Sequence, residues 1–176
     1  MSFELAQLQQ MLLDGYGRIG EGVPAVIEGL SVEELLWRPD AQANHIAWLV
    51  WHLARQQDDQ LAHLGGLPSR WLDHDWVSRF DLPYPRDAHG YGMSDSEVGA
   101  FRLDDPSLLT AYHADVHDLT AQVIASLTPV WLDEVIDRNW DPPVTAGVRI
   151  VSIVDDAAKH LGQAEYLRGL VVRRRS

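Results

Sequence analysis

The sequence predicts an all-α protein in which four long helices form a bundle. Four long segments repeat apolar residues three and four positions apart, as on one face of a helix. The chain shows no convincing alternation of apolar and polar residues, so no strand is expected. With 176 residues, of which 46% are hydrophobic and 23% charged, we expect one globular domain over residues 1–176.

The first helix is expected over residues 3–30, where the apolar series begins at Leu5 and reaches Val26. Several glycines and a proline interrupt its second half. Because glycine and proline weaken a helix interior, we expect a kink or a break near Gly20–Pro24.

A short helix is expected before the second long one. Ser31 and Glu34 have the spacing of a capping box, which predicts a short helix that ends before Pro39. A long helix follows over residues 41–63, and Gly65-Gly66 stops it. Its core-facing stripe consists of Ile46, Leu49, Val50, Leu53 and Leu64. One edge of that stripe is polar and consists of His45, His52, Gln56 and His63.

The rest of the chain contains two more long helices and two irregular segments. Residues 65–104 are rich in proline, glycine and aromatic residues, and a short capped helix is expected over residues 94–101. Pro106 opens the third long helix, which reaches Leu127. A second irregular segment leads from there into the last helix, over residues 148–172.

Composition and charge limit the classes of function. The net charge of -12 argues against a nucleic-acid binder, because phosphate recognition needs a concentrated basic surface. The basic cluster Arg173–Arg175 is interpreted as a solvated tail that suits the negative end of the last helix. No stretch approaches the ~20 apolar residues that span a bilayer, and the N-terminus does not resemble a signal peptide, so a cytoplasmic protein is expected. The lack of cysteine excludes thiolate ligands, so any thiol chemistry needs a small-molecule thiol.

Three residues of two helices predict a metal site. Asp156 and His160 are four apart on the last helix, so their side chains lie on one face, one turn apart. The best supplier of a third ligand is His52 on the second long helix. Three ligands that leave a coordination position open are typical of a catalytic metal, and this donor set suits Zn, Ni, Fe or Cu. The alternative is a histidine packed at the core edge beside a solvated helix face.

A rival pair lies on the third long helix. His113 and His117 are also four apart, and His74 or His89 of the long connection would have to complete their coordination. Two aspartates nearby make a solvated helix face an equally good interpretation. Spacing alone therefore does not decide between the two candidate sites.

Three stretches resemble the DinB-like superfamily. They are NHIAWLVWHLARQQDD at residues 44–59, GYGMSDSEV at residues 90–98, and GVRIVSIVDD at residues 147–156 with HLGQAEYLRG at residues 160–169. The resemblance keeps order and spacing over nearly the whole chain. It is closest to the actinobacterial branch that includes mycothiol-dependent maleylpyruvate isomerase and mycothiol S-transferases.

The resemblance implies both topology and ligands. It implies a four-helix bundle of up-down-down-up topology in which His52, Asp156 and His160 hold one divalent metal ion. Asp156 stands where many relatives have His or Glu, and its shorter reach implies a weakened or altered metal site. His113 and His117 would then line the substrate cavity.

The resemblance also implies an activity. The protein would be a metal-dependent transferase, with Zn expected and Ni or another metal as alternatives, that joins the thiol of mycothiol to small electrophiles in detoxification. Gln56, Asp59 and Arg168 would contact the polar cosubstrate, and the aromatic connection from Trp71 to Tyr91 would cover an apolar electrophile. The alternatives are a metal-dependent hydrolase and a non-enzymatic bundle that binds a small molecule. A monomer and a homodimer are both compatible with the sequence.

Overall fold

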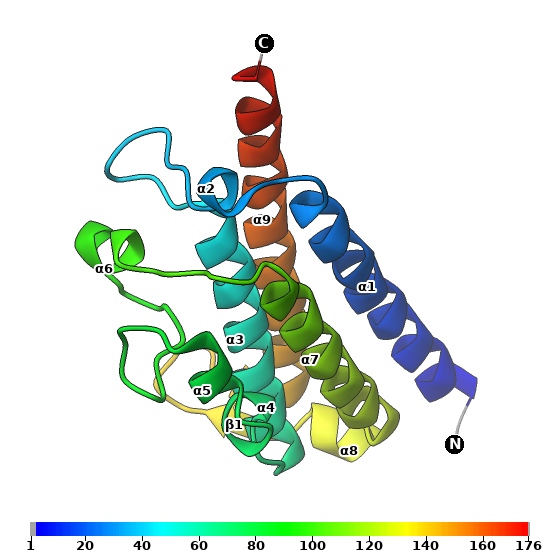
Figure 1. Cartoon of the computed structure of the whole chain (residues 1–176). Coiled ribbons are helices and arrows are strands. Elements are labelled where there is room, and N and C mark those ends of the chain that lie inside the picture. The colour runs from blue at the N-terminus through cyan, green and yellow to red at the C-terminus, as the bar shows by residue number, and fades with distance from the viewer. Residues whose placement is uncertain (1–2, 176) are drawn as a thin grey trace.

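Four long helices make up the core of the protein, as the computed structural model of residues 3–175 shows (Figure 1). They are α1 (Phe3–Ile27), α3 (Ile46–Gly65), α7 (Ser107–Ala125) and α9 (Ala146–Arg173). Helices α1 and α9 run in one direction, while α3 and α7 run in the other (Figure 1). The predicted all-α bundle of up-down-down-up topology is confirmed.

Helix α3 is the most deeply buried of the four because it packs against both α7 and α9. Every residue from Ile46 to Arg55 is buried. Its neighbour α9 runs antiparallel to it and packs along it (Figure 1). This pairing brings polar residues from distant parts of the sequence to one point of the bundle.

Helices α3 and α7 are parallel neighbours (Figure 1). Because the chain must return along the length of the bundle between them, a long connection is required. The connection contains three short helices, α4 (Arg70–Asp73), α5 (Trp76–Phe80) and α6 (Asp95–Gly99). Ser94 and Glu97 form the capping box that starts α6, as predicted. The segment between α5 and α6 returns to α3 and supplies part of the candidate site described below.

The expected break in the first helix is wrong, because α1 runs through Pro24 and ends at Ile27. Gly22 of this segment serves helix packing. A Cβ atom on Gly22 would lie 2.5 Å from Cδ2 of Leu161, so the missing side chain allows α9 to approach. Pro24 is exposed and lies in the last turn, so the backbone hydrogen bond that it cannot donate is lost close to the end of the helix.

The second long helix begins later than predicted. It starts at Ile46 rather than Ala41, with His45 as its N-cap. The His45 ring accepts a hydrogen bond from the Trp48 backbone N–H at 3.0 Å through Nδ1. The preceding short helix α2 (Val32–Leu35) has the predicted capping box between Ser31 and Glu34.

Two short strands correct the expectation that the chain contains no strand. Strand β1 (Val135–Asp137) pairs antiparallel with β2 (Val144–Thr145), after the short helix α8 (Pro129–Leu132). Strands this short do not produce a recognisable alternation in the sequence, so their pairing depends on tertiary contacts. Thr145 then caps α9 by accepting a hydrogen bond from the Val148 N–H.

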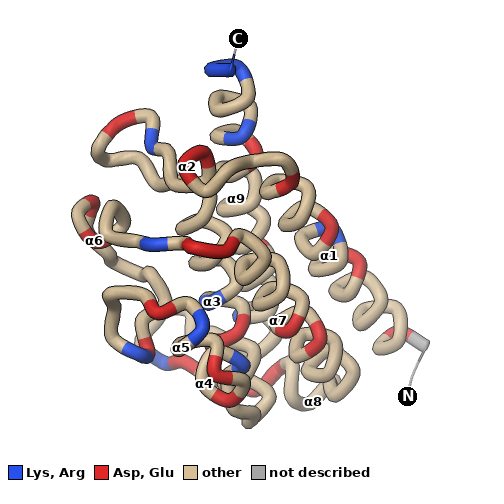
Figure 2. The backbone as a smooth tube through the Cα atoms, viewed as in Figure 1, with Lys and Arg blue, Asp and Glu red and all other residues tan. Residues whose placement is uncertain are grey.

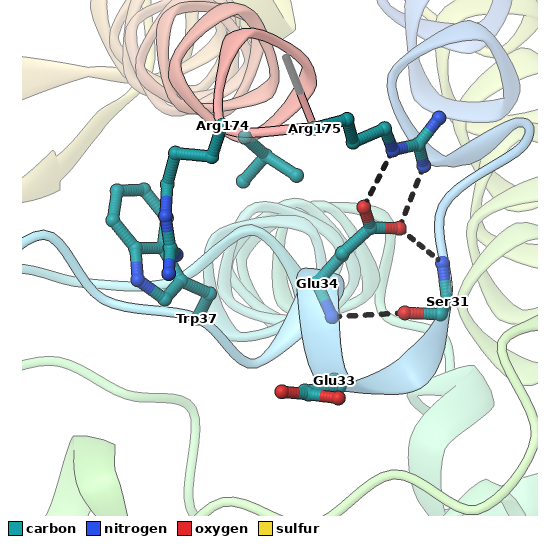
Figure 3. A pocket seen from close by; sticks show the side chains of 7 residues that line it. Ser31, Glu33, Glu34, Trp37, Arg174 and Arg175 are labelled. Atoms are coloured by element: carbon teal, nitrogen blue, oxygen red, sulfur yellow. Dashed lines mark hydrogen bonds and ion pairs between the residues drawn. The ribbon is translucent and has the colours of Figure 1, made fainter.

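The basic C-terminal end is partnered rather than simply solvated, which corrects the interpretation as a free tail. Arg175 makes a bidentate ion pair with Glu34, with contacts of 2.6 and 2.7 Å (Figure 3). The Arg174 guanidinium lies 4.3 Å from the Trp37 ring centroid. These side chains line a pocket of about 390 Å³ whose charges largely satisfy one another.

Charge is spread unevenly along the fold. Acidic residues lie along α1 and α7, while basic residues mark the C-terminal end of α9 (Figure 2). Among the helices of residues 3–175, none combines the length and the apolar character that a membrane crossing needs.

Candidate metal centre

His52, Asp156 and His160 meet at the contact between α3 and α9. One ligand atom from each lies within 4.8 Å of the others. Within residues 3–175, no other group of three His, Asp or Glu side chains brings its ligand atoms this close together. His52 is buried, whereas the side chains of Asp156 and His160 are 42% and 18% exposed. The centre therefore has a buried side on α3 and an open side at Asp156.

The backbone of the long connection orients the His52 ring. Its Nδ1 lies 2.5 Å from the carbonyl oxygen of His89, so Nδ1 carries the proton and donates it. The lone pair is then on Nε2, the other ring nitrogen. Burial lowers the pKa of His52 to about 4, which keeps the imidazole neutral at pH 7, the form that binds a metal.

Gly90 allows this close approach of backbone and ring. Its φ is +97°, and a Cβ atom at this position would lie 2.4 Å from Nδ1 of His52. The Trp48 indole stacks on the His52 ring at 4.6 Å between centroids. The His52 imidazole is thus held by a hydrogen bond on one edge and an aromatic ring on one face.

His160 is oriented in the same way by a side chain one turn further along α9. Its Nδ1 lies 3.2 Å from Oε1 of Gln163, which leaves Nε2 directed at the centre. Nε2 is 3.5 Å from Oδ1 of Asp156. Burial opposes protonation of His160. The Asp156 carboxylate outweighs this effect and raises the pKa of His160, because it stabilises the positively charged imidazole.

Asp156 completes the donor set. The other carboxylate oxygen, Oδ2, is buried yet hydrogen-bonds to none of the described residues. The adjacent His160 lowers the pKa of the carboxyl group, so Asp156 is ionised at neutral pH. Two imidazole nitrogens and one carboxylate with an unsatisfied oxygen fit a divalent metal ion, with coordination positions left on the open side.

A buried ionic network supports the backbone that orients His52. The Arg55 guanidinium donates to the carbonyl oxygens of Ala88 at 3.0 Å and Asp87 at 3.5 Å. It lies 3.6 Å from the Asp58 carboxylate, and both side chains are at most 2% exposed. Arg55 therefore fixes the segment that ends at the His89 carbonyl.

Asp58 connects this network to the rest of the fold. Its carboxylate accepts hydrogen bonds, each 2.8 Å long, from the backbone N–H groups of Arg70 and Trp71 and from the Tyr112 hydroxyl. Burial raises the pKa of Asp58, while these donors and Arg55 oppose that effect. This network is not among the site residues predicted from the sequence. The sequence signal for it is a pair of opposite charges, Arg55 and Asp58, three residues apart on the second long helix.

The rival pair does not form a second centre. His113 is buried, and the ring of His117 faces Gly20 of α1, 3.7 Å from the position of a Cβ atom there. His74 is paired with Asp115 at 2.7 Å, and the His89 backbone lies beside His52. Neither histidine of the connection therefore completes coordination by His113 and His117.

The predicted cosubstrate contacts lie at different distances from the centre along the helices. Gln56 is one turn beyond His52 on α3 and accepts a hydrogen bond from Gln60. Asp59 lines a polar pocket of about 350 Å³ near the C-terminal end of α3. Arg168 donates to backbone carbonyl oxygens at the end of α1, 2.7 Å from that of Glu28. Their role toward a cosubstrate stays a prediction.

The aromatic residues of the connection mostly form core packing. Trp71, Trp76 and Phe80 are buried, and each packs against Tyr112 of α7. Tyr91, in contrast, is 82% exposed. The role of this connection as a cover over an electrophile stays a prediction.

The fold and the site together define a four-helix bundle with a candidate metal centre of two histidines and one aspartate. The family model described as the DinB superfamily matches residues 19–164, and the chain belongs to this superfamily. A similar solved structure is described as the crystal structure of the conserved protein of locus from Enterococcus faecalis. It is 32% identical, covers 93% of this chain and 96% of its own, and superposes with a TM-score of 0.87. No curated protein matches the chain.

Proposed function

We propose that the protein is a metal-dependent mycothiol S-transferase, which joins the thiol of mycothiol to small electrophiles. The observation that carries the proposal is the arrangement of His52 and His160. Each ring has its Nδ1 committed to an oxygen acceptor, which leaves each Nε2 for a metal, and one ligand atom of each ring lies within 4.8 Å of an Asp156 oxygen. Zn is the expected metal and Ni the alternative, because this donor set accepts both.

The chemistry needs an ionised thiol and an open coordination position. A bound divalent metal would lower the pKa of a coordinated thiol so that it reacts as the thiolate. Asp156 lies on the exposed side of the centre, where the thiol enters and its proton leaves to water. The chain itself contains no cysteine, which agrees with an external thiol. The mycothiol branch itself is supported by the sequence resemblance described above.

The polar cosubstrate has a candidate position along α3. Asp59 lines the polar pocket of about 350 Å³ together with His63, Asn139 and Arg149. Hydroxyl and amide groups of a sugar-containing thiol match such a lining, since Asp59 accepts hydrogen bonds, Arg149 donates them and Asn139 does both. Gln56 lies between this pocket and His52 on the same helix, so we propose that it contacts the cosubstrate too.

Metal-dependent hydrolysis is the alternative function. The open side at Asp156 would admit water as readily as a thiol, and an activated water would attack an amide or ester. The two functions differ in one observable: the transferase consumes thiol, whereas the hydrolase turns over without it. A bundle that only binds a small molecule would do neither.

The test is the consumption of mycothiol with a chlorinated nitroarene, in protein loaded with Zn or Ni and in protein treated with chelator. We expect turnover with metal and none with chelator, and we expect the His52→Ala variant to be inactive. His117→Ala is the matched control, because His117 lies outside the centre, and it should retain turnover. Metal-loaded protein that consumes no thiol but hydrolyses an ester would overturn the transferase proposal.

A further inference from the structure

Another hollow adjoins the metal centre through Gln163, in the groove between α3 and α9. This α3–α9 pocket has a volume of about 600 Å³. From the two helices it is lined by Leu49, Lys159, Gly162, Gln163, Tyr166 and Leu167, and the segment 42–44 closes one side.

The pocket and the metal centre share a side chain. Gln163 lines the pocket, and its Oε1 accepts the hydrogen bond from Nδ1 of His160. Leu49 lies three residues before His52 on α3, and Gln163 lies three residues after His160 on α9. With a rise of about 1.5 Å per residue, each is one helical turn from a metal ligand, on the same end of the centre.

The lining favours an uncharged, largely apolar molecule. Leu49 and Leu167 are buried and form an apolar wall, while the Tyr166 side chain is 68% exposed. Lys159 is ion-paired with Asp155 at 2.5 Å, so its charge is already balanced. The pocket around Asp59 lies further along α3 and differs in carrying Asp137 and Arg149.

We infer that the α3–α9 pocket binds the acceptor, a small apolar and electron-poor molecule such as a halogenated arene, and presents its reacting carbon to the metal centre. This inference rests on the proposed function. In the transfer, the S–C bond forms at that carbon while the carbon–halogen bond breaks, and the halide leaves with the bonding electrons. The thiol proton passes to water at Asp156.

Gly162 offers a precise way to test this. A Cβ atom at Gly162 would meet no described atom within 4 Å, so a side chain there extends into open space at the pocket. The Gly162→Met variant places a side chain in the pocket and also improves helix propensity, so it should fold. Gly162→Ala adds only a methyl group. Gly17→Met is the matched control, since Gly17 of α1 also has open space around its Cβ position.

The first measurement is binding of 1,3-dinitrobenzene, an unreactive nitroarene, to metal-loaded protein by equilibrium dialysis without thiol. Gly162→Met should raise its dissociation constant about tenfold or more, whereas Gly162→Ala and Gly17→Met should leave it within about twofold. In turnover, Gly162→Met should raise the KM for the chlorinated nitroarene and leave the KM for mycothiol unchanged.

The outcomes separate this inference from the proposed function. Turnover by Gly162→Met with an unchanged acceptor KM would overturn the pocket assignment and leave the transferase standing. Gly162-dependent binding of the nitroarene by a protein that consumes no thiol would support the pocket and overturn the transferase. A dissociation constant that changes equally in Gly162→Met and Gly17→Met would also overturn the pocket assignment.

Discussion

Nδ1 of His52 lies 2.5 Å from the carbonyl oxygen of His89, thirty-seven positions away in the sequence. This contact fixes the tautomer of a residue on α3 by the backbone of the long connection. The connection thereby becomes part of the metal centre without contributing a ligand. Changes that shift the backbone near His89 should therefore change metal affinity as well as stability.

The first prediction concerns Gly90. A Gly90→Ala variant places Cβ 2.4 Å from Nδ1 of His52, so the ring or the backbone must move. We expect a loss of stability of roughly 1–3 kcal/mol and a clear loss of metal affinity, measured by urea unfolding and by chelator competition. Gly92→Ala is the control, because Gly92 also has a positive φ of 73° but its Cβ position has no described atom within 4 Å. Equal metal affinities in the two variants would contradict the role of Gly90.

The second prediction concerns the buried pair of Arg55 and Asp58. The Arg55→Met variant leaves the Asp58 carboxylate without its cation and releases the Ala88 carbonyl. We expect a loss of stability of about 3–5 kcal/mol in urea unfolding. Arg18→Met breaks the exposed pair with Asp14 and should cost little, because exposed ion pairs are screened by water.

A separate readout tests whether Arg55 positions the metal centre. Metal affinity should fall in Arg55→Met under conditions where the variant is fully folded, because the segment before His89 has lost its support. The Arg55→Lys variant keeps the charge and should restore part of the stability, but it cannot reproduce the forked hydrogen bonds to two carbonyl groups. Unchanged metal affinity in folded Arg55→Met would show that the network is purely structural.

The third prediction concerns acid sensitivity. Burial lowers the pKa of His113 to about 4, from an ordinary value near 6.5, and the neighbouring His117 contributes in the same direction. Between these values the unfolded chain binds a proton that the folded chain does not, so the free energy of unfolding falls as pH decreases from about 6.5 to 4. At the low end, His113 accounts for a loss of roughly 3 kcal/mol.

The variant His113→Gln tests this directly, because it removes the titrating group and leaves a polar side chain. Urea unfolding at several pH values should show a shallower slope between pH 6.5 and 4. Some slope should persist, since burial also lowers the pKa of His45 to about 4. An equal slope in His113→Gln and the original protein would contradict the prediction.

The sequence predicts those parts of the fold that depend on local signals. Apolar periodicity predicts the four long helices, and the serine and glutamate spacing predicts the capping boxes of Ser31 and Ser94. It fails where tertiary packing overrides local preference, as at Gly22, which is required by the approach of Leu161 rather than marking a break in α1. The two short strands depend in the same way on contacts that periodicity does not contain.

The candidate site, too, is predicted where local signals suffice and missed where it depends on tertiary contacts. The spacing of Asp156 and His160 identifies half of it, but helical spacing alone ranks His113 and His117 equally. The resemblance to the superfamily favours His52 as the third residue, and the structure brings these three together. The supporting roles of Arg55, His89 and Gly90 arise from contacts between distant segments, so no local pattern in the sequence reveals them.

The most direct measurement of the central claim is the metal content of purified protein after dialysis against Zn, determined by elemental analysis. The original protein and His113→Ala should each retain about one metal ion per chain, while Asp156→Ala and His160→Ala should fold and retain none. Retention of metal by the Asp156 and His160 variants together with its loss in His113→Ala would contradict the assignment and place the site on α7.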